Sequence, residues 1–184
     1  MTQYQQKYRV ESARLKGWDY RQRGWYFVTM CAQNHVCIFG EVVGGEVQLS
    51  RVGLIAELEM QSLHNHYHNV QVDELVVMPN HVHAIIMIDR AHDFSPTAKM
   101  SCPFKSADSA FASPKGGSLA AIIRSYKSGV SRRCHELGLN IAWQTRFHDH
   151  LLRGDKVIDA VCEYIRNNPA NWGVDRENPF RPHS

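Results

Sequence analysis

A strand with two histidines at its start is predicted for the segment His81-Val82-His83-Ala84-Ile85-Ile86-Met87-Ile88. Side chains alternate between the two faces of a strand, so His81 and His83 point the same way while Val82, Ala84, Ile86 and Ile88 face the core. Residues 70–77 predict a second strand. Met78-Pro79-Asn80 between them predicts a break, since proline has no N–H for a ladder. The two strands therefore form an adjacent pair.

Further strands are expected on the N-terminal side and near the C-terminus. Residues 25–30 are rich in aromatic and β-branched side chains, and residues 36–39 begin a second extended stretch. Gly44-Gly45 separates residues 41–43 from residues 46–49, which is a two-glycine hairpin signal. Residues 147–152 predict a short last strand.

Three helices complete the predicted order. Ser50 is expected to cap a helix over residues 52–64, and Ser118 one that runs to about residue 137. Asp155 is expected to cap the last helix, which reaches Asn168 and is ended by Pro169. The order β-β-α-β-β-α-β-α predicts an α+β protein with an antiparallel sheet covered by helices.

Length and composition fit a single domain over residues 1–184, with 43% hydrophobic and 21% charged residues. We expect a basic arm at residues 1–23, a mobile insert at residues 89–117 and a short tail at residues 175–184. No apolar run approaches the roughly 18–20 residues of a membrane span, and the N-terminus lacks an apolar signal region, so a cytoplasmic protein is expected. Five cysteines without a CxxC pair argue against a disulfide framework or a thiolate zinc knuckle. A net charge of +3 permits a nucleic-acid partner without requiring one.

Two pairs of residues are candidates for chemistry. His81 and His83 on one strand face form a potential bidentate clamp for a divalent metal, although an isolated HxH also occurs as two exposed strand histidines. Tyr164 and Asn168 are spaced i,i+4 and therefore share one helix face. Taken alone, Tyr164 is typical of a half-buried core tyrosine, and Asn168 is typical of a residue that ends a helix.

The residues around these pairs resemble a known family. Glu74-Leu75-Val76-Val77-Met78-Pro79-Asn80-His81-Val82-His83 looks like the signature of the single-tyrosine HUH transposases, and within them of the REP-associated tyrosine transposase branch. Supporting segments follow in the family's order: Trp25-Tyr26-Phe27-Val28-Thr29, Ile123-Arg124-Ser125-Tyr126-Lys127-Ser128, Trp143-Gln144 with Phe147-His148-Asp149-His150, and Tyr164-Ile165-Arg166-Asn167-Asn168-Pro169. The resemblance covers about residues 14–174.

This resemblance implies a fold, an activity and a set of site residues. The fold would be a ferredoxin-like or RRM-like sheet, and the activity a metal-dependent cleavage and joining of single-stranded or hairpin DNA. His81 and His83 would hold Mg²⁺ or Mn²⁺, Asn168 would be the third protein ligand, and Tyr164 would be the nucleophile that forms a 5′-phosphotyrosine. Similar proteins occur as monomers and as dimers, so a homodimer stays open.

Other residues are assigned weaker roles. Arg124, Lys127, Arg132 and Arg133 on the middle helix, and Arg14 and Lys16 before the first strand, are candidate phosphate contacts, with a solvated helix face as the alternative. His148 and His150 form a second same-face pair on the last strand. His150 is expected to lie near the site in a structural or phosphate-adjacent role rather than as a ligand.

Two other functions are weighed against the transposase. A module that binds hairpin DNA without cleaving it would keep the same residues, because displacements of about 1 Å can abolish chemistry. A metal hydrolase of the histidine-triad kind would want a third alternating histidine, but Ile85 occupies that position.

Overall fold

The structure is a computed structural model, which describes residues 2–4, 8–10, 18–89, 116–175 and 177–180. A short hairpin of β1 (Thr2–Tyr4) and β2 (Tyr8–Val10) pairs antiparallel at the N-terminus. The predicted insert lies mostly outside the described residues, as do Arg14 and Lys16.

A four-stranded antiparallel sheet forms the centre of the molecule. Its strands are β3 (Gly24–Cys31), β6 (Val70–Val77), β7 (His81–Ile88) and β8 (His148–Leu152), in the spatial order β6-β7-β3-β8. β7 and β3 are therefore central, and the predicted pairing of β6 with β7 is confirmed. This arrangement confirms the α+β class with an antiparallel sheet and packed helices.

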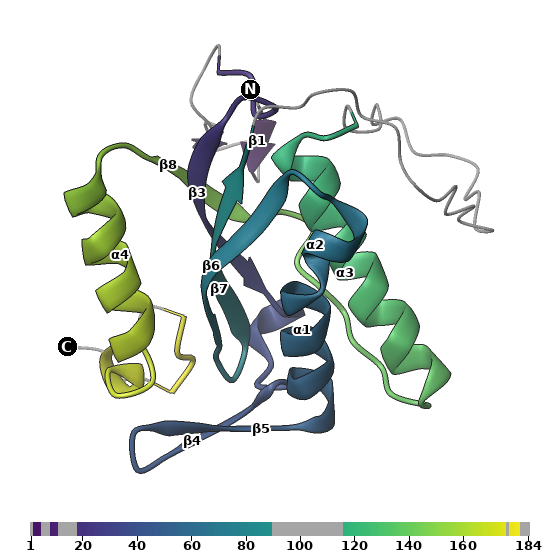
Figure 1. Ribbon diagram of the computed structural model, residues 1–184. Coiled ribbons are helices and arrows are strands. Elements are labelled where there is room, and N and C mark those ends of the chain that lie inside the picture. Colours follow the sequence, from purple (N-terminus) through teal and green to yellow (C-terminus); the bar gives the residue numbers. More distant parts are fainter. Residues whose placement is uncertain (1, 5–7, 11–17, 90–115, 176, 181–184) are drawn as a thin grey trace.

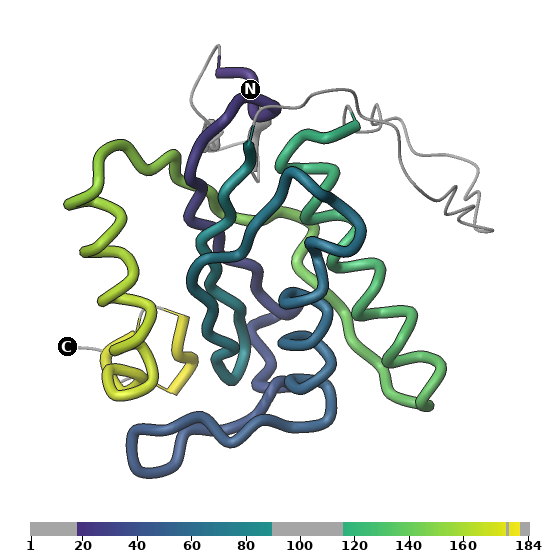
Figure 2. The backbone as a smooth tube through the Cα atoms, viewed as in Figure 1, coloured from purple at the N-terminus to yellow at the C-terminus, as the bar shows by residue number. Residues whose placement is uncertain are grey.

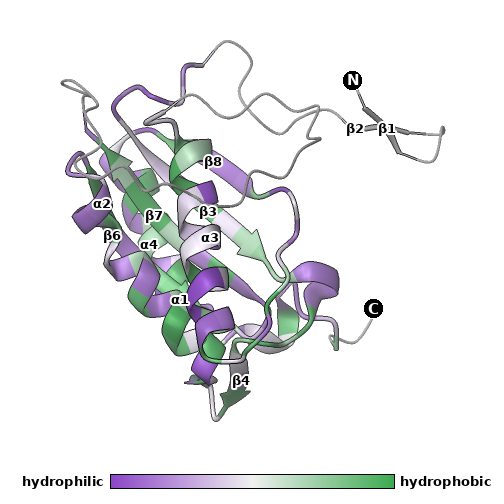
Figure 3. Ribbon diagram, turned by 90° about the vertical axis from the view of Figure 1, so that its right-hand side faces the viewer, coloured by the Kyte–Doolittle hydropathy of each residue, from purple (hydrophilic) through white to green (hydrophobic). Residues whose placement is uncertain are grey.

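Helices cover both faces of this sheet (Figure 1). On one face lie α1 (Arg51–Gln61), the short α2 (Leu63–His66) and α3 (Leu119–Glu136), and on the other lies α4 (Asp155–Asn167). Figure 3 shows α1 and α3 in front of the sheet, with hydrophobic and hydrophilic residues on different sides of α1. None of the helices in the described ranges is both long and apolar enough to cross a bilayer.

The two faces of the sheet are buried in clusters of different size. Val82, Ala84, Ile86 and Ile88 of β7 belong to the main core, which also includes buried side chains of α1 and α3, as the alternation in the sequence predicted. On the other face a small cluster, which we call the α4 cluster, consists of Ile85, Leu152, Cys162 and Ile165. The site residues predicted on β7 and α4 therefore lie on the α4 side.

The caps of the first and middle helices agree with the sequence, but that of the last helix does not. The backbone N–H of Gly53 donates to Oγ of Ser50 at 3.1 Å, and that of Ala121 donates to Oγ of Ser118 at 3.3 Å. The last helix was wrongly predicted to be capped by Asp155. Gly154 occupies its N-cap with φ of 87° and no side-chain cap, and Asp155 stands in the first turn, where its charge favours the helix dipole.

The predicted extended stretch at residues 36–39 is not a strand. It follows a 3-10 helix, η1 (Gln33–His35), and leads into a separate hairpin of β4 (Gly40–Val43) and β5 (Glu46–Leu49). Gly44 and Gly45 have φ of 63° and 84°, as a tight two-residue hairpin turn requires, so the glycine signal is confirmed. The tube in Figure 2 shows this hairpin projecting below the sheet.

Candidate active site

The two histidines of the HxH pair are buried side by side on the α4 face of the sheet. His81 is 0% exposed and His83 is 3% exposed. Because β7 is a central strand, His81 has Cys31 as its cross-strand neighbour on β3, and His83 has Thr29. The Nε2 atoms of the two imidazoles lie 3.0 Å apart, so both rings direct the same nitrogen to one point.

Asn80 sets the tautomer of His81. Its Nδ2 donates to the backbone oxygens of His35 at 3.2 Å and Glu177 at 2.6 Å. With the amide nitrogen committed in this way, Oδ1 is the atom that faces Nδ1 of His81 at 2.8 Å. An amide oxygen can only accept, so Nδ1 of His81 carries the proton, and Nε2 presents its lone pair when the ring is neutral.

Both imidazoles are held neutral by burial. Desolvation lowers the pKa of His81 to about 3, with a further contribution from the charge of His35. Desolvation also lowers the pKa of His83 to about 3, followed by the effect of His81. Nδ1 of His83 lies 2.9 Å from Oγ1 of Thr29, which can accept its proton and so leave Nε2 of this ring free as well. Two neutral imidazoles with converging nitrogens are the form that a metal ion requires.

A carboxylate oxygen suitable for a divalent metal adjoins the histidine pair, and a second oxygen donor is buried at the end of α4. A carboxylate oxygen of Asp175 and one nitrogen each of His81 and His83 all lie within 4.8 Å of one another. Asn168 is the C-cap of α4 and is 2% exposed. Its Oδ1 is buried and has no hydrogen-bond partner within the part of the chain that the structure describes. A buried, unsatisfied amide oxygen is costly without a partner, so these residues fit a divalent cation bound by nitrogen and oxygen.

Tyr164 projects from α4 toward the same point. Its Oη lies 3.5 Å from Nε2 of His83, and the two rings are 5.5 Å apart between centroids. Phe27 of β3 meets the edge of the Tyr164 ring at 6.0 Å and also lies against His83 at 5.1 Å. Tyr164 is 48% exposed, and its ring packs against Phe27 of the sheet.

Apolar and polar contacts with the sheet position α4. Ile165 and Cys162 pack in the α4 cluster, and Cys162 Sγ donates to a carboxylate oxygen of Asp73 at 3.8 Å. Arg166 pairs with Glu74 of β6 at 2.5 Å. The pKa of Arg166 is raised above its ordinary value, mainly because its side chain is hydrogen-bonded to Glu74. These contacts come from residues within two positions of Tyr164 on the helix and hold its ring over the sheet.

His150 lies near the site but not within its ligand group. It is an exposed residue of β8 and the cross-strand neighbour of Phe27, and the two rings stack at 6.5 Å with an interplanar angle of 13°. Among the described residues it belongs to neither of the two groups of His, Cys, Asp and Glu that could hold a metal.

The predicted basic residues of α3 have different surroundings. Arg124 and Arg132 are exposed. Arg133 forms an ion pair with Glu59 of α1 at 2.9 Å. Nζ of Lys127 donates to the backbone oxygens of Gln144 at 2.7 Å and Arg146 at 3.2 Å, and burial lowers the pKa of Lys127 to about 8. Lys127 therefore holds a loop, whereas Arg124 and Arg132 are available to a polyanion.

Three residues of the site were missed from the sequence. Asp175 falls in the segment taken as a tail, and nothing in its local sequence distinguishes it from a solvated aspartate. Phe27 and Thr29 lie on the same strand face as each other, but only the pairing of β3 with β7 brings them into contact with His83. The alternation of side chains along β3 predicts that Phe27 and Thr29 share a face. It does not predict that β7 is the neighbouring strand.

Comparison with other proteins supports the fold. No family model matches the chain. A protein of Haemophilus influenzae described as uncharacterized is 31% identical over 169 residues, which cover 90% of this chain and 91% of that protein. The solved structure of a REP-associated tyrosine transposase bound to a REP hairpin has a TM-score of 0.55 and 19% identity, over 91% of this chain and 77% of that one. A crystal structure described as a putative transposase from Deinococcus radiodurans has a TM-score of 0.44 and 12% identity, over 84% of this chain and 95% of that one.

The structural likeness to the REP-associated tyrosine transposase extends over most of the chain. The sequence likeness to the Haemophilus influenzae protein extends over nearly the whole of both chains. The chain thus belongs to one family with that Haemophilus influenzae protein and has the fold of the REP-associated tyrosine transposase.

Proposed function

We propose that the protein is a metal-dependent endonuclease and strand transferase for single-stranded or hairpin DNA, with Tyr164 as its nucleophile. The observation that carries this proposal is the 3.5 Å distance between Oη of Tyr164 and Nε2 of His83, whose Nε2 is itself 3.0 Å from that of His81. A tyrosine hydroxyl beside a pair of neutral, converging imidazoles combines a nucleophile with a metal clamp. Because both groups belong to one chain, one subunit can supply the whole site.

In this proposal His81 and His83 hold Mg²⁺ or Mn²⁺, and Asp175 and Asn168 are the candidate oxygen ligands. The bound cation would polarise the scissile phosphate and offset the charge that develops on its oxygens. His81 contributes Nε2 because Asn80 keeps the proton on Nδ1. His83 can contribute Nε2 when Thr29 accepts the proton of Nδ1. Hydrogen bonds of this kind from outside the ligand set orient the rings.

The reaction on Tyr164 balances without a further reactant. Its oxygen forms a bond to phosphorus, the bond from phosphorus to the 3′ oxygen breaks, and the phenolic proton is released to solvent at this half-exposed position. The products are a 5′-phosphotyrosine and a strand with a free 3′-hydroxyl. Since the phosphodiester energy is kept, a second 3′-hydroxyl can reverse the step and join strands.

The DNA partner is proposed from two observations. The transposase of similar fold was solved with a REP hairpin bound to it. In this chain Arg124 and Arg132 are exposed on α3 and can contact phosphates, whereas Arg133 is engaged in an ion pair with Glu59.

The test is a denaturing gel of the protein with labelled hairpin oligonucleotides from both strands flanking its own gene, in Mg²⁺, Mn²⁺ or EDTA. We expect a protein-linked DNA band that requires the metal and is absent from Tyr164→Phe. Tyr67→Phe is the matched control, because Tyr67 packs against the main core and should leave the band unchanged. An adduct that persists in Tyr164→Phe would contradict the assignment. Salt-sensitive binding of one hairpin without an adduct would favour a silent DNA-binding module.

A further inference from the structure

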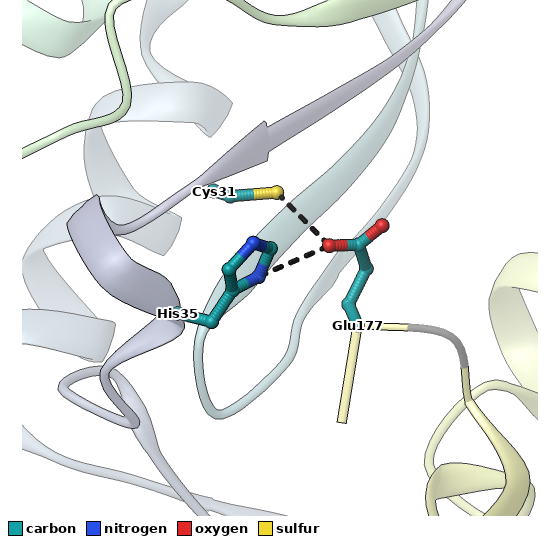
Figure 4. Close-up of side chains that lie close together, drawn as sticks. All are labelled: Cys31, His35 and Glu177. Carbon is teal, nitrogen blue, oxygen red and sulfur yellow. Dashed lines mark hydrogen bonds and ion pairs between the residues drawn. The ribbon is translucent and has the colours of Figure 1, made fainter. Parts of the chain in front are cut away.

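A second group of metal-binding side chains lies beside the histidine pair. Figure 4 shows Cys31 at the end of β3, His35 at the end of η1 and Glu177 of the C-terminal segment converging on one point. One donor atom from each of the three lies within 4.8 Å of the other two. Cys31 is buried, and the side chains of His35 and Glu177 are 39% and 27% exposed.

Two of the separations between donor atoms are close to those of ligands around a single small cation. Oε2 of Glu177 lies 3.6 Å from Sγ of Cys31 and 3.1 Å from Nδ1 of His35. A tetrahedral Zn²⁺ with ordinary bond lengths places sulfur about 3.6 Å from oxygen and nitrogen about 3.4 Å from oxygen. Nδ1 of His35 is buried and faces the carboxylate without the alignment of a hydrogen bond. The three atoms thus approach one another as ligands do, with little rearrangement needed to receive an ion.

The backbone around this group is held in an uncommon conformation. Asn34 and His35 have φ of 56° and 53°, the left-handed region that non-glycine residues rarely occupy. Such strain persists only where surrounding contacts impose it, and it collects at functional sites. Here Nδ2 of Asn80 bonds to the backbone oxygens of both His35 and Glu177, which ties the two ligand-bearing segments together.

Gln144 completes the surroundings of His35. Its side-chain amide lies 2.9 Å from Nε2 of His35, and its backbone N–H donates to the oxygen of Cys31 at 2.9 Å. An amide can present its oxygen or its nitrogen by turning over. With the oxygen toward His35, Gln144 would accept the Nε2 proton and leave the lone pair of Nδ1 for a metal, which is the usual arrangement around a metal-binding histidine.

We propose that Cys31, His35 and Glu177 form a second metal site, selective for Zn²⁺ or a similar thiophilic divalent cation and distinct from the site of His81 and His83. A thiolate, an imidazole and a carboxylate are a donor set that zinc takes, with a water molecule in the fourth position. The hard cations Mg²⁺ and Mn²⁺ prefer oxygen ligands and have little affinity for sulfur. The site would fasten the C-terminal segment to the end of β3. The proposal does not depend on the DNA chemistry of Tyr164.

The exchange of protons on binding is simple. Without the ion, burial, followed by the charge of Glu177, raises the pKa of the Cys31 thiol to about 12, and the S–H donates to Glu177. Binding forms the bond from sulfur to the metal and releases the thiol proton to solvent, as at other thiolate metal sites. A divalent cation offsets both the burial of the thiolate and its repulsion by the carboxylate. Nothing is oxidised or reduced.

The experiment uses Co²⁺ as the probe, since it replaces Zn²⁺ and gives a near-ultraviolet charge-transfer band only when bound to thiolate. The full chain is stripped of metal, reduced and titrated with Co²⁺ in excess Mg²⁺, and Zn²⁺ is then added. We expect a band that saturates at one equivalent and is abolished by Zn²⁺. The band should persist in Cys37→Ser, the matched control for a thiol outside the group, and in the double variant His81→Ala/His83→Ala. Absence of a thiolate band from the wild-type protein would overturn the proposal.

Two variants separate loss of the ligand from loss of the fold. His35→Asn removes Nδ1 but keeps a residue that tolerates a positive φ, and Glu177→Gln keeps the shape of the side chain. Each should fold with the circular dichroism spectrum of the wild type and should bind Co²⁺ at least tenfold more weakly. Cys31→Ser should abolish the band. A band of unchanged affinity in both His35→Asn and Glu177→Gln, or a band in Cys31→Ser, would show that the three residues are not the ligands.

Discussion

Asn80 accepts the Nδ1 proton of His81 at 2.8 Å, and this contact directs Nε2 of the histidine toward His83. The amide is oriented by two backbone oxygens that its nitrogen must satisfy, so the tautomer follows from the fold. Asn80, which precedes the HxH pair in sequence, thus fixes which nitrogen of His81 is available to a ligand.

Substitutions of Asn80 separate its two roles, which are to accept a hydrogen bond from His81 and to donate to the backbone oxygens of His35 and Glu177. In Asn80→Asp a carboxylate oxygen can still accept from His81, but no donor is left for the carbonyls of His35 and Glu177. We expect Mn²⁺ affinity to stay within about threefold of the wild type while stability falls by about 1–3 kcal/mol. In Asn80→Ala we expect Mn²⁺ affinity to fall about 10–100-fold as well. Calorimetric titration and thermal unfolding measure the two effects, with Asn69→Ala as a control. Equal Mn²⁺ affinities of the two variants would contradict the tautomer argument.

The metal-free protein should lose stability as the pH falls from about 6.5 to about 3. Unfolded histidines bind protons below their ordinary pKa of about 6.5, whereas burial keeps His81 and His83 neutral in the folded state down to about 3. The unfolded state therefore holds more protons in this window, and each histidine contributes a slope of up to about 1.4 kcal/mol per pH unit. Urea unfolding in EDTA measures the slope. His83→Gln should reduce it, and an unchanged slope in that variant would contradict the assignment.

Phe27 should affect chemistry more than stability. It supports both Tyr164 and His83 from the sheet, and leucine at this position fills the space without an aromatic edge. We expect Phe27→Leu to lower the rate of adduct formation about tenfold or more, because small displacements of a nucleophile are costly. Single-turnover kinetics with a hairpin substrate measure this rate. Phe147→Leu, which alters a side chain packed against the main core, should leave it within twofold.

The basic residues of α3 should divide into two classes. Arg124→Ala and Arg132→Ala are each expected to weaken hairpin binding and to reduce the slope of log affinity against log salt by up to about 1. Lys127→Met should instead cost about 1–3 kcal/mol of stability, because the backbone oxygens of Gln144 and Arg146 lose their donor. Its salt slope should stay at the wild-type value. A reduced slope for Lys127→Met would mean that this lysine also reaches phosphate.

The sequence predicted the elements of the sheet well, because their patterns are local. The bounds of β6 and β7 agree with the predicted residues, and Ser50 and Ser118 cap their helices by the bonds that their side chains predict. The error at residues 36–39 has a physical cause, since Asn34 and His35 adopt a left-handed backbone, which few non-glycine residues adopt and which no local pattern here predicts.

The contacts of the site were less predictable than its elements. The shared face of His81 and His83 follows from strand alternation, and that of Tyr164 and Asn168 from helical spacing. The approach of Asp175 and Glu177 to residues of β3 and β7 depends on how the chain returns after Pro169. No local pattern encodes that return, so both carboxylates were assigned to a tail.

The separation of the two apolar clusters has a consequence for the motions of the site. β7 is anchored in the main core, whereas α4 packs on the sheet through the small α4 cluster, the partly buried Ile158 and Val161, and the pair of Arg166 with Glu74. Local opening costs least where few apolar contacts must be broken. The amide hydrogens of α4 should therefore exchange with deuterium sooner than those of β7. The histidine pair and Tyr164 then belong to two cooperative units of unequal stability.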